Sequence, residues 1–385
     1  MAYPSHSRPL RVAFVAATLG MGGAEKQLAY MVGELHRRGV DARVFSLVST
    51  GPNLTKIVNL GVPVIPFASS ASRLARLACL ARELRVFSPD CIQSSHFFTN
   101  FYAGVVGRIL GIPVLGALRG DGATDVADCG WLGSWGLRLP HLLVANSQAA
   151  LDYVAARLGN QKRAVLVSNV IDLAAFDAQT ISPRPVTAAG RSLVFGVGRL
   201  VAVKRFELFI SALAQARAAA PSLTGVLVGD GPERTRLQAH AAALGMLPDG
   251  CLFLGSRDDV PGLLRQGAGV LLTSSNEGFP NVILEAMAAS LPVITTPAGD
   301  AARVVRDGVT GHVVPHGAVA AMARHLVEWV RDPAMAAAQG EAGRTRAVEF
   351  YSSAALADRL LSLYATVGKS NVREVVLASN PSPSL

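Results

Sequence analysis

Short apolar runs alternate with helix-patterned segments along most of the chain, and this alternation restricts the fold more than any other feature. The run Arg11–Val15 precedes a glycine-rich turn, after which apolar residues recur at helical spacing until Gly39. Alternating strands and helices build parallel sheets with helices on both faces. The first half therefore predicts an α/β domain with strands at Arg11–Val15, Arg43–Val48, Cys91–Ser95, Pro113–Leu118, Leu142–Ala145 and Val165–Val167.

The alternation breaks once and then restarts. Residues 178–192 hold two prolines, a glycine and small polar residues that cannot extend a helix, so we expect a linker there. A second doubly wound domain over residues 193–350 is expected, after an N-terminal domain of residues 1–177. Helical segments should follow it, the last over residues 351–368, and then a frayed tail over residues 369–385. The expected strands are Leu193–Gly196, Gly225–Val228, Leu252–Leu254, Val270–Leu272, Val293–Thr295 and His312–Val314.

Composition excludes several classes of protein. A hydrophobic fraction of 50% argues against disorder, and no apolar stretch approaches the length of about 20 residues that spans a membrane. The four cysteines form no C-x-x-C pair, which disfavours zinc, and the N-terminus lacks a secretion signal. We therefore expect a cytoplasmic protein with reduced thiols.

Positive charge is concentrated in the first half. The formal net charge is +9, and residues 1–120 hold 13 basic against 5 acidic residues, a net charge of +8. Such a surface favours anionic partners, although nucleic acid is disfavoured because the basic residues are not interleaved with aromatics. Arginines at 73, 76, 82 and 85 share a predicted helix with Leu74, Leu77, Ala81 and Leu84. That helix, with Trp131 and Trp135, is a candidate for docking on an anionic membrane; core leucines and solvated arginines are the alternative.

The strongest motif lies between Ser274 and Met287, after the strand Val270–Leu272. Gly278 permits unusual backbone angles and Pro280 suits the start of a helix, whose free N–H groups attract anions. Glu277 and Glu285 are about two helical turns apart and would face one ligand at different depths. Carboxylates accept two hydroxyls at once, as sugars and riboses require. A solvated Glu277 on a capping loop stays the alternative.

Two further loops hold ligand-binding residue types. Arg199 and Lys204 lie between a strand and a helix, where cations suit phosphate; a basic surface loop is the alternative. Gly22 and Gly23 would let backbone N–H groups approach a ligand, and a plain tight turn explains them equally well.

Taken in order, these motifs resemble those of glycosyltransferase family 4. They are Gly-Gly-Ala-Glu at 22–25, Asn169 with Asp172, Gly-Val-Gly-Arg-Leu at 196–200 with Lys204, Val-Gly-Asp-Gly-Pro at 228–232, Glu277-Gly278-Phe279-Pro280 with Glu285, and Asp307-Gly308 with Gly311. The resemblance covers roughly residues 10–365. It implies retaining enzymes of the GT-B fold: two Rossmann-like domains with a deep cleft, the last helix crossing back to the first domain.

The resemblance also implies residue roles. The C-terminal domain would bind a nucleotide-diphosphate sugar, by default a UDP-sugar, and the N-terminal domain a lipid-linked or saccharide acceptor. The residues near the chemistry would be His96, Arg199, Lys204 and Glu277. The donor would contact these cations and Glu277, together with Gly22, Gly23, Gly229, Arg257, Gly278, Phe279, Pro280, Asn281 and Glu285. Glu25, Arg119 and Asn169 would lie on the acceptor side.

Three positions depart from the family pattern. Val170 replaces glycine after Asn169, Ser290 stands where glycine is usual, and Arg119-Gly120-Asp121 replaces a His-containing loop, which leaves the acceptor open.

The developing charge of a departing diphosphate needs preorganised cations and N–H groups. Arg199 and Lys204 would supply the cations, so no metal or other cofactor is expected, and the resemblance implies front-face attack with retention. A nucleotide-sugar 2-epimerase and a non-catalytic sugar-nucleotide-binding protein are the alternatives.

Overall fold

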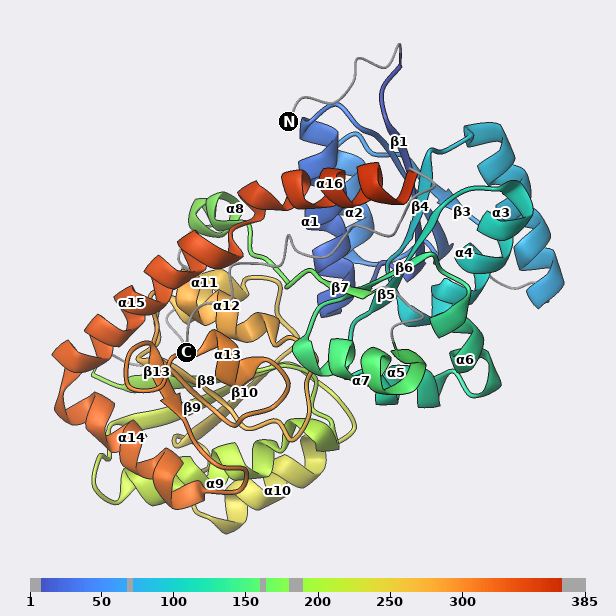
Figure 1. Ribbon diagram of the computed structural model, residues 1–385. Helices are drawn as coiled ribbons and strands as arrows, with labels where there is room; N and C mark the ends of the chain where they lie inside the picture. Colours follow the sequence, from blue (N-terminus) through green and yellow to red (C-terminus); the bar gives the residue numbers. More distant parts are fainter. Residues whose placement is uncertain (1–7, 68–71, 160–163, 180–189, 369–385) are drawn as a thin grey trace. The chain divides into compact units, whose positions relative to one another are not determined.

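The computed structural model describes residues 8–67, 72–159, 164–179 and 190–368. The chain forms two compact units (Figure 1). One comprises the described residues up to Val170 together with those from Ser353, and the other comprises Ile171–Ser352. Most of the expected linker and the whole expected tail lie outside the described residues.

The first unit contains a parallel sheet of seven strands in the order β3-β2-β1-β4-β5-β6-β7. Six of them match the predicted runs, whereas β3 was missed because it is only three residues long and ends in proline at the edge of the sheet. The strands are β1 (Arg11–Thr18), β2 (Asp41–Val48), β3 (Val64–Pro66), β4 (Cys91–Ser94), β5 (Val114–Leu118), β6 (Leu142–Ala145) and β7 (Ala164–Leu166).

Helices cover both faces of this sheet. Helix α1 (Gly23–Arg37) buries Leu28, Val32 and Leu35 in one core, while α3 and α4 pack into the other. The remaining helices are α2 (Pro52–Asn59), α3 (Arg73–Phe87), α4 (Phe97–Leu110), α5 (Ala123–Asp128), α6 (Trp131–Arg138), α7 (Gln148–Leu158) and α16 (Leu356–Gly368).

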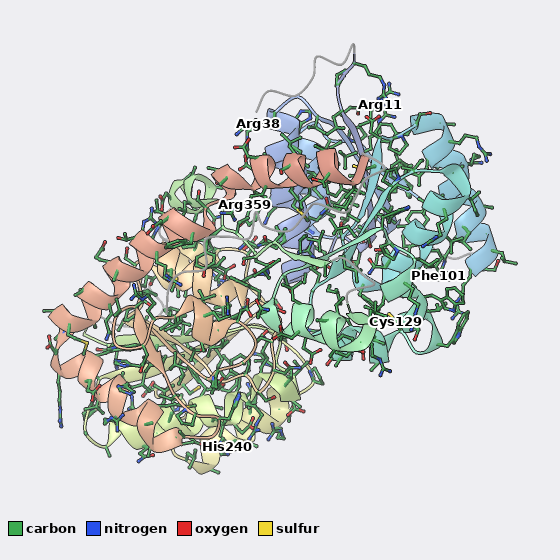
Figure 2. The ribbon with its side chains drawn as sticks, viewed as in Figure 1. Arg11, Arg38, Phe101, Cys129, His240 and Arg359 are labelled. Atoms are coloured by element: carbon green, nitrogen blue, oxygen red, sulfur yellow. The ribbon has the colours of Figure 1, made fainter. Side chains whose placement is uncertain are left out.

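Helix α16, near the end of the chain, belongs to the first unit and lies beside α1 (Figure 1). Leu356, Leu360 and Tyr364 follow helical spacing and are buried in the same core as α1. At the end of α1, Arg38 donates hydrogen bonds of 2.9 and 3.0 Å to the two carboxylate oxygens of Asp358; Figure 2 labels Arg38. These contacts join the C-terminal helix α16 to the N-terminal part of the chain in one unit.

The second unit contains a parallel sheet of six strands in the order β10-β9-β8-β11-β12-β13. Phe195 of β8 faces one core and Val194 the other, so this sheet is also covered on both faces, as predicted. The strands are β8 (Ser192–Val197), β9 (Leu223–Val228), β10 (Cys251–Gly255), β11 (Gly269–Leu272), β12 (Val293–Thr295) and β13 (Gly311–Val313). The helices are α8 (Leu173–Ala178), α9 (Phe206–Arg217), α10 (Arg234–Ala243), α11 (Val260–Leu264), α12 (Asn281–Ala288), α13 (Ala301–Val304), α14 (Val319–Arg331) and α15 (Pro333–Tyr351).

The boundary between the units lies at Val170–Ile171, ahead of the expected end of the first domain at residue 177. The physical reason is burial: Ile171 and Phe176 pack in a core of the second unit. The chain returns at Ser352–Ser353.

Each sheet reverses its strand order once, between β1 and β4 in the first unit and between β8 and β11 in the second. Open parallel sheets bind ligands at the carboxyl ends of the strands beside such a reversal. We therefore expect the candidate ligand-binding residues at the carboxyl ends of β1 and β4 and of β8 and β11.

Candidate active site

In the second unit, Lys204 and Glu277 meet beside the reversal of strand order. Lys204 follows β8 and Glu277 follows β11, which are neighbouring strands. Lys204 Nζ contacts Glu277 Oε1, and the Ser274 hydroxyl donates to the same oxygen at 2.7 Å. The side chains are 21% and 14% exposed, so both can exchange this contact for one with a ligand.

The two loops are also joined through their backbones. Ser275 N donates to Val203 O at 2.9 Å, and the Thr273 hydroxyl donates to Lys204 O at 2.8 Å. Arg205, the residue after Lys204, has a φ of +51°, a left-handed conformation that turns the chain into α9. The position of Lys204 is therefore fixed by both loops.

Two glycines allow the close backbone contacts on which this arrangement depends. A Cβ on Gly229 would lie 1.9 Å from Gly198 O. A Cβ on Gly299 would lie 2.2 Å from Glu277 O and 2.4 Å from Gly278 O. The sequence did not predict a role for Gly299. The only indication was that this glycine follows a strand, β12.

The other predicted donor residues are spread around the same edge. Glu285 lies on α12 and is half-buried, Phe279 is buried, and Pro280 immediately precedes α12, which begins at Asn281. Arg199 is exposed. Arg257 is exposed and forms an ion pair of 2.6 Å with Asp259.

In the first unit, His96 and Glu25 meet beside the reversal between β1 and β4. His96 precedes α4, and its Nδ1 accepts a hydrogen bond from Ala17 N at 3.2 Å. The proton must therefore lie on Nε2, which is 3.4 Å from Glu25 Oε1. The Glu25 side chain folds back over the turn. Its Oε2 lies so close to Gly22 that a Cβ there would be only 2.2 Å away.

Two predicted acceptor-side residues follow other strands of this sheet. Arg119 follows β5, and Asn169, which is buried, follows β7. The backbone after Asn169 is held by Gln27 of α1, which donates to Val170 O at 2.7 Å and accepts from Val170 N at 2.9 Å. Gln27 had no recognisable sequence signal.

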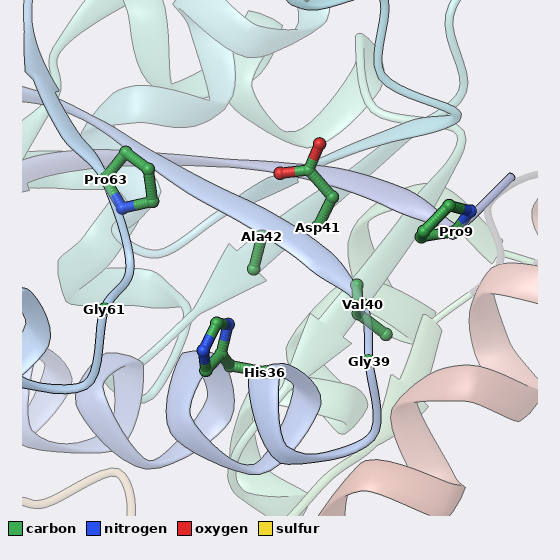
Figure 3. A pocket seen from close by; sticks show the side chains of 8 residues that line it. All are labelled: Pro9, His36, Gly39, Val40, Asp41, Ala42, Gly61 and Pro63. Carbon is green, nitrogen blue, oxygen red and sulfur yellow. The ribbon is translucent and has the colours of Figure 1, made fainter.

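A pocket of about 280 Å³ lies at the opposite edge of the first sheet (Figure 3). Strand β2 begins at Asp41, so the pocket is at the amino ends of the strands, away from the candidate residues. Its lining is Pro9, His36, Gly39, Val40, Asp41, Ala42, Gly61 and Pro63.

A pair of stacked histidines lies elsewhere in the second unit. The ring centroids of His312 and His325 are 3.8 Å apart, and the ring planes are within 9° of parallel. One ring nitrogen of each histidine lies within 4.8 Å of a carboxylate oxygen of Glu328. Trp329 Nε1 donates to Gln339 Oε1, which turns the Gln339 amide nitrogen toward His312 Nε2 at 3.2 Å. His312 therefore accepts at Nε2 and carries its proton on Nδ1.

This histidine pair predicts a pH dependence of stability. Burial lowers the pKa of His312 and the nearby His325 adds to this, whereas Asp307 and Glu328 act in the opposite direction. A lowered pKa stabilises the fold above the unfolded-state pKa of about 6.5, and this contribution is lost as the pH falls. We expect the thermal midpoint to fall between about pH 7 and pH 5, and less so in His312→Gln.

The control is His316→Gln, which removes an exposed histidine close by and should keep the wild-type pH profile. Identical profiles for all three proteins would contradict the assignment to His312.

Two family descriptions match the chain, one in each half. Residues 21–175 match "Glycosyltransferase Family 4" and residues 177–346 match "Glycosyl transferases group 1". The chain therefore belongs to the family 4 (group 1) glycosyltransferases with the GT-B fold.

The curated relatives agree with this assignment. The lipopolysaccharide core biosynthesis glycosyltransferase LpsD of Rhizobium meliloti is 27% identical over 366 residues, which cover 89% of this chain and 95% of LpsD. Alpha-D-kanosaminyltransferase of Streptomyces kanamyceticus is 31% identical over 180 residues, 46% of each chain. The chain spans about half the length of several curated relatives that it matches, 46% for the kanosaminyltransferase and 52% for LpsE of R. meliloti.

Solved structures share the fold. HepE from Anabaena, in complex with UDP-glucose, has a TM-score of 0.80 at 22% identity over 93% of this chain and all of that one. WaaG, described as involved in lipopolysaccharide biosynthesis, has a TM-score of 0.68 at 17% identity over 92% of this chain and 99% of that one.

Proposed function

We propose that the protein is a retaining glycosyltransferase of cell-surface polysaccharide, lipopolysaccharide or glycolipid synthesis. It moves a sugar from a nucleotide-diphosphate sugar, with UDP-sugars the first choice, to a lipid-linked or saccharide acceptor. The observation that carries the proposal is the meeting of Lys204 and Glu277 at the strand-order reversal of the second sheet. HepE, a protein of the same fold, has been solved with UDP-glucose, which supports the choice of donor.

The chemistry follows from charge. A nucleoside diphosphate that leaves the sugar gains negative charge, and Lys204, Arg199 and the N–H groups at the start of α12 would stabilise it. Glu277, released from Lys204, would accept hydrogen bonds from the sugar hydroxyls. In this proposal the chain's own cations neutralise the diphosphate, so no metal takes part.

His96 of the first unit would donate a hydrogen bond to a sugar hydroxyl. Because its Nδ1 accepts from Ala17 N, the hydrogen that it can donate lies on Nε2. The acceptor hydroxyl would attack the face from which the diphosphate leaves, and the leaving phosphate would take the proton.

The test of this function is a product analysis with UDP-, GDP- and ADP-sugars. A transferase releases a nucleoside diphosphate and needs an acceptor or water to do so. A 2-epimerase would convert the donor without releasing a nucleoside diphosphate, and a binding protein would leave every donor intact. Either of these last two results would refute the proposal.

We also propose that the first unit docks on an anionic membrane through a patch formed by Arg73, Leu74, Trp131 and Trp135. Leu74, Trp131 and Trp135 are 78%, 66% and 51% exposed, and the Arg73 guanidinium lies 5.6 Å from the Trp131 ring centroid. Exposed aromatic and basic side chains together suit an anionic lipid surface. None of the described helices combines the length and apolar character needed to cross a bilayer.

The predicted helix differs from α3 in two respects. The buried face of α3 consists of Leu80, Leu84 and Phe87, so Leu74 is a surface residue and not part of the core. Arg76 is half-buried and donates to the Tyr102 hydroxyl at 3.4 Å, so it is not a solvated arginine.

We expect Leu74→Ser combined with Trp131→Ser to abolish sedimentation with phosphatidylglycerol vesicles, because the apolar anchors are lost. The matched control is Val86→Ser, which removes another apolar residue of α3, 80% exposed and outside the patch. Equal sedimentation of the two variants would contradict the membrane proposal.

A further inference from the structure

Arg119 brings a positive charge to the carboxyl-terminal edge of the first sheet, and it forms no salt bridge with any residue that the structure describes. It directly follows β5, in which every residue is buried. Its Nε is enclosed and has no hydrogen-bond partner among the described residues, and its Nη2 contacts the Met31 sulfur at 4.0 Å. The residue as a whole is half-buried.

The acidic residue near Arg119 is engaged elsewhere. Asp125 accepts a hydrogen bond from Gly120 N at 2.9 Å, and burial raises the pKa of this carboxyl. Burial lowers the pKa of Arg119 to about 10, although Asp125 acts in the opposite direction. A desolvated charge without a partner is costly to the fold, which favours a role in binding.

The neighbouring strands add two more enclosed polar atoms. In the sheet, β5 lies between β4 and β6, so Arg119 lies between His96, which follows β4, and Asn146, which follows β6. Asn146 Nδ2 donates to Arg119 O at 3.2 Å, while Asn146 Oδ1 is enclosed without a hydrogen-bond partner in the described part of the chain. His96 Nε2 is enclosed as well, with Glu25 Oε1 3.4 Å away. The edge thus offers donors for an anion and an acceptor for a hydroxyl.

We propose that Arg119 binds an oxyanion of the acceptor, so that the protein glycosylates a hydroxyl close to a phosphate or carboxylate group. The planar guanidinium matches two oxygens of either group, and Asn146 Oδ1 would accept from a hydroxyl beside it. This inference rests on the proposed function, because it names the class of acceptor.

The test is a calorimetric titration of the full chain with inorganic phosphate and, separately, with malonate. Saturable binding of one anion by the wild type is expected, and Arg119→Gln should weaken it about ten- to hundredfold. Arg119→Lys keeps the charge but loses the two-pronged geometry, so it should bind with intermediate affinity. Preference for phosphate indicates a phosphorylated acceptor, and preference for malonate indicates an acidic sugar.

Controls separate this site from the donor site. Lys204→Ala should keep the anion binding that depends on Arg119, because Lys204 belongs to the second unit. Arg119→Met should fold with unchanged or higher thermal stability, because an apolar side chain replaces an unpaired buried charge. The titration needs no sugar transfer, so its result is distinct from that of the product analysis. Equal binding by the wild type and Arg119→Gln, no binding by the wild type, or loss of binding in Lys204→Ala would overturn the proposal.

Discussion

Lys204→Ala is expected to lower the rate of nucleoside diphosphate release by about 10²–10³-fold, the usual effect of removing one group that stabilises developing negative charge. Lys204 is held at the carboxyl edge of the second sheet by the loops after β8 and β11. The measurement is the initial rate of nucleoside diphosphate release from the donor that the wild-type protein consumes.

The fold should survive this change. The pair with Glu277 is partly exposed, and the Ser274 hydroxyl still donates to Glu277 Oε1 when Lys204 is removed. The matched control is Arg205→Ala, which removes the adjacent, exposed cation, paired with Glu207, and should change the rate by no more than about twofold. If both variants lost activity equally, local positive charge and not the position of Lys204 would explain the effect.

Gly299→Ala should destabilise the second unit by about 2–4 kcal/mol and weaken donor binding, although residue 299 carries no functional side chain. A methyl group there would lie 2.2 Å from Glu277 O, so the loop that bears Glu277 must move. Denaturant unfolding gives the stability change, and titration with the donor gives the change in affinity.

Gly317→Ala is the control for the backbone conformation alone. Gly317 has a φ of +76° and Gly299 a φ of +56°, but a Cβ on Gly317 would meet nothing within 4 Å. Its substitution should cost about 1 kcal/mol and leave donor affinity unchanged. Equal effects of the two substitutions would show that the Gly299–Glu277 contact does not position the loop.

The sheets could be predicted because strands buried on both faces are continuous apolar runs. The bounds of Leu142–Ala145 and Val293–Thr295 match the structure residue for residue. The run Val64–Pro66 was missed because a three-residue edge strand beside proline has no such pattern.

Residue types singled out the members of the candidate site, but they did not predict the contacts between them. The pairing of Lys204 with Glu277 joins positions 73 residues apart, and only the strand order makes them neighbours. The Gln27 side chain binds backbone groups of Val170, and Gly299 packs against backbone oxygens of the Glu277 loop; no residue pattern reveals such contacts. Ser290 has a φ of +54°, in the left-handed region that favours glycine. This backbone conformation accounts for the glycine that is usual at this position.

The most direct test of the central claim is a thermal-shift titration with UDP-, GDP- and ADP-sugars on the wild type and on Glu285→Ala. Glu285 lies on α12, which follows β11 of the second sheet, and it is one of the residues that the donor would contact. We predict that one class of nucleotide sugar raises the thermal midpoint of the wild type and has a much smaller effect on Glu285→Ala. An equal shift for both proteins would contradict the donor site described above.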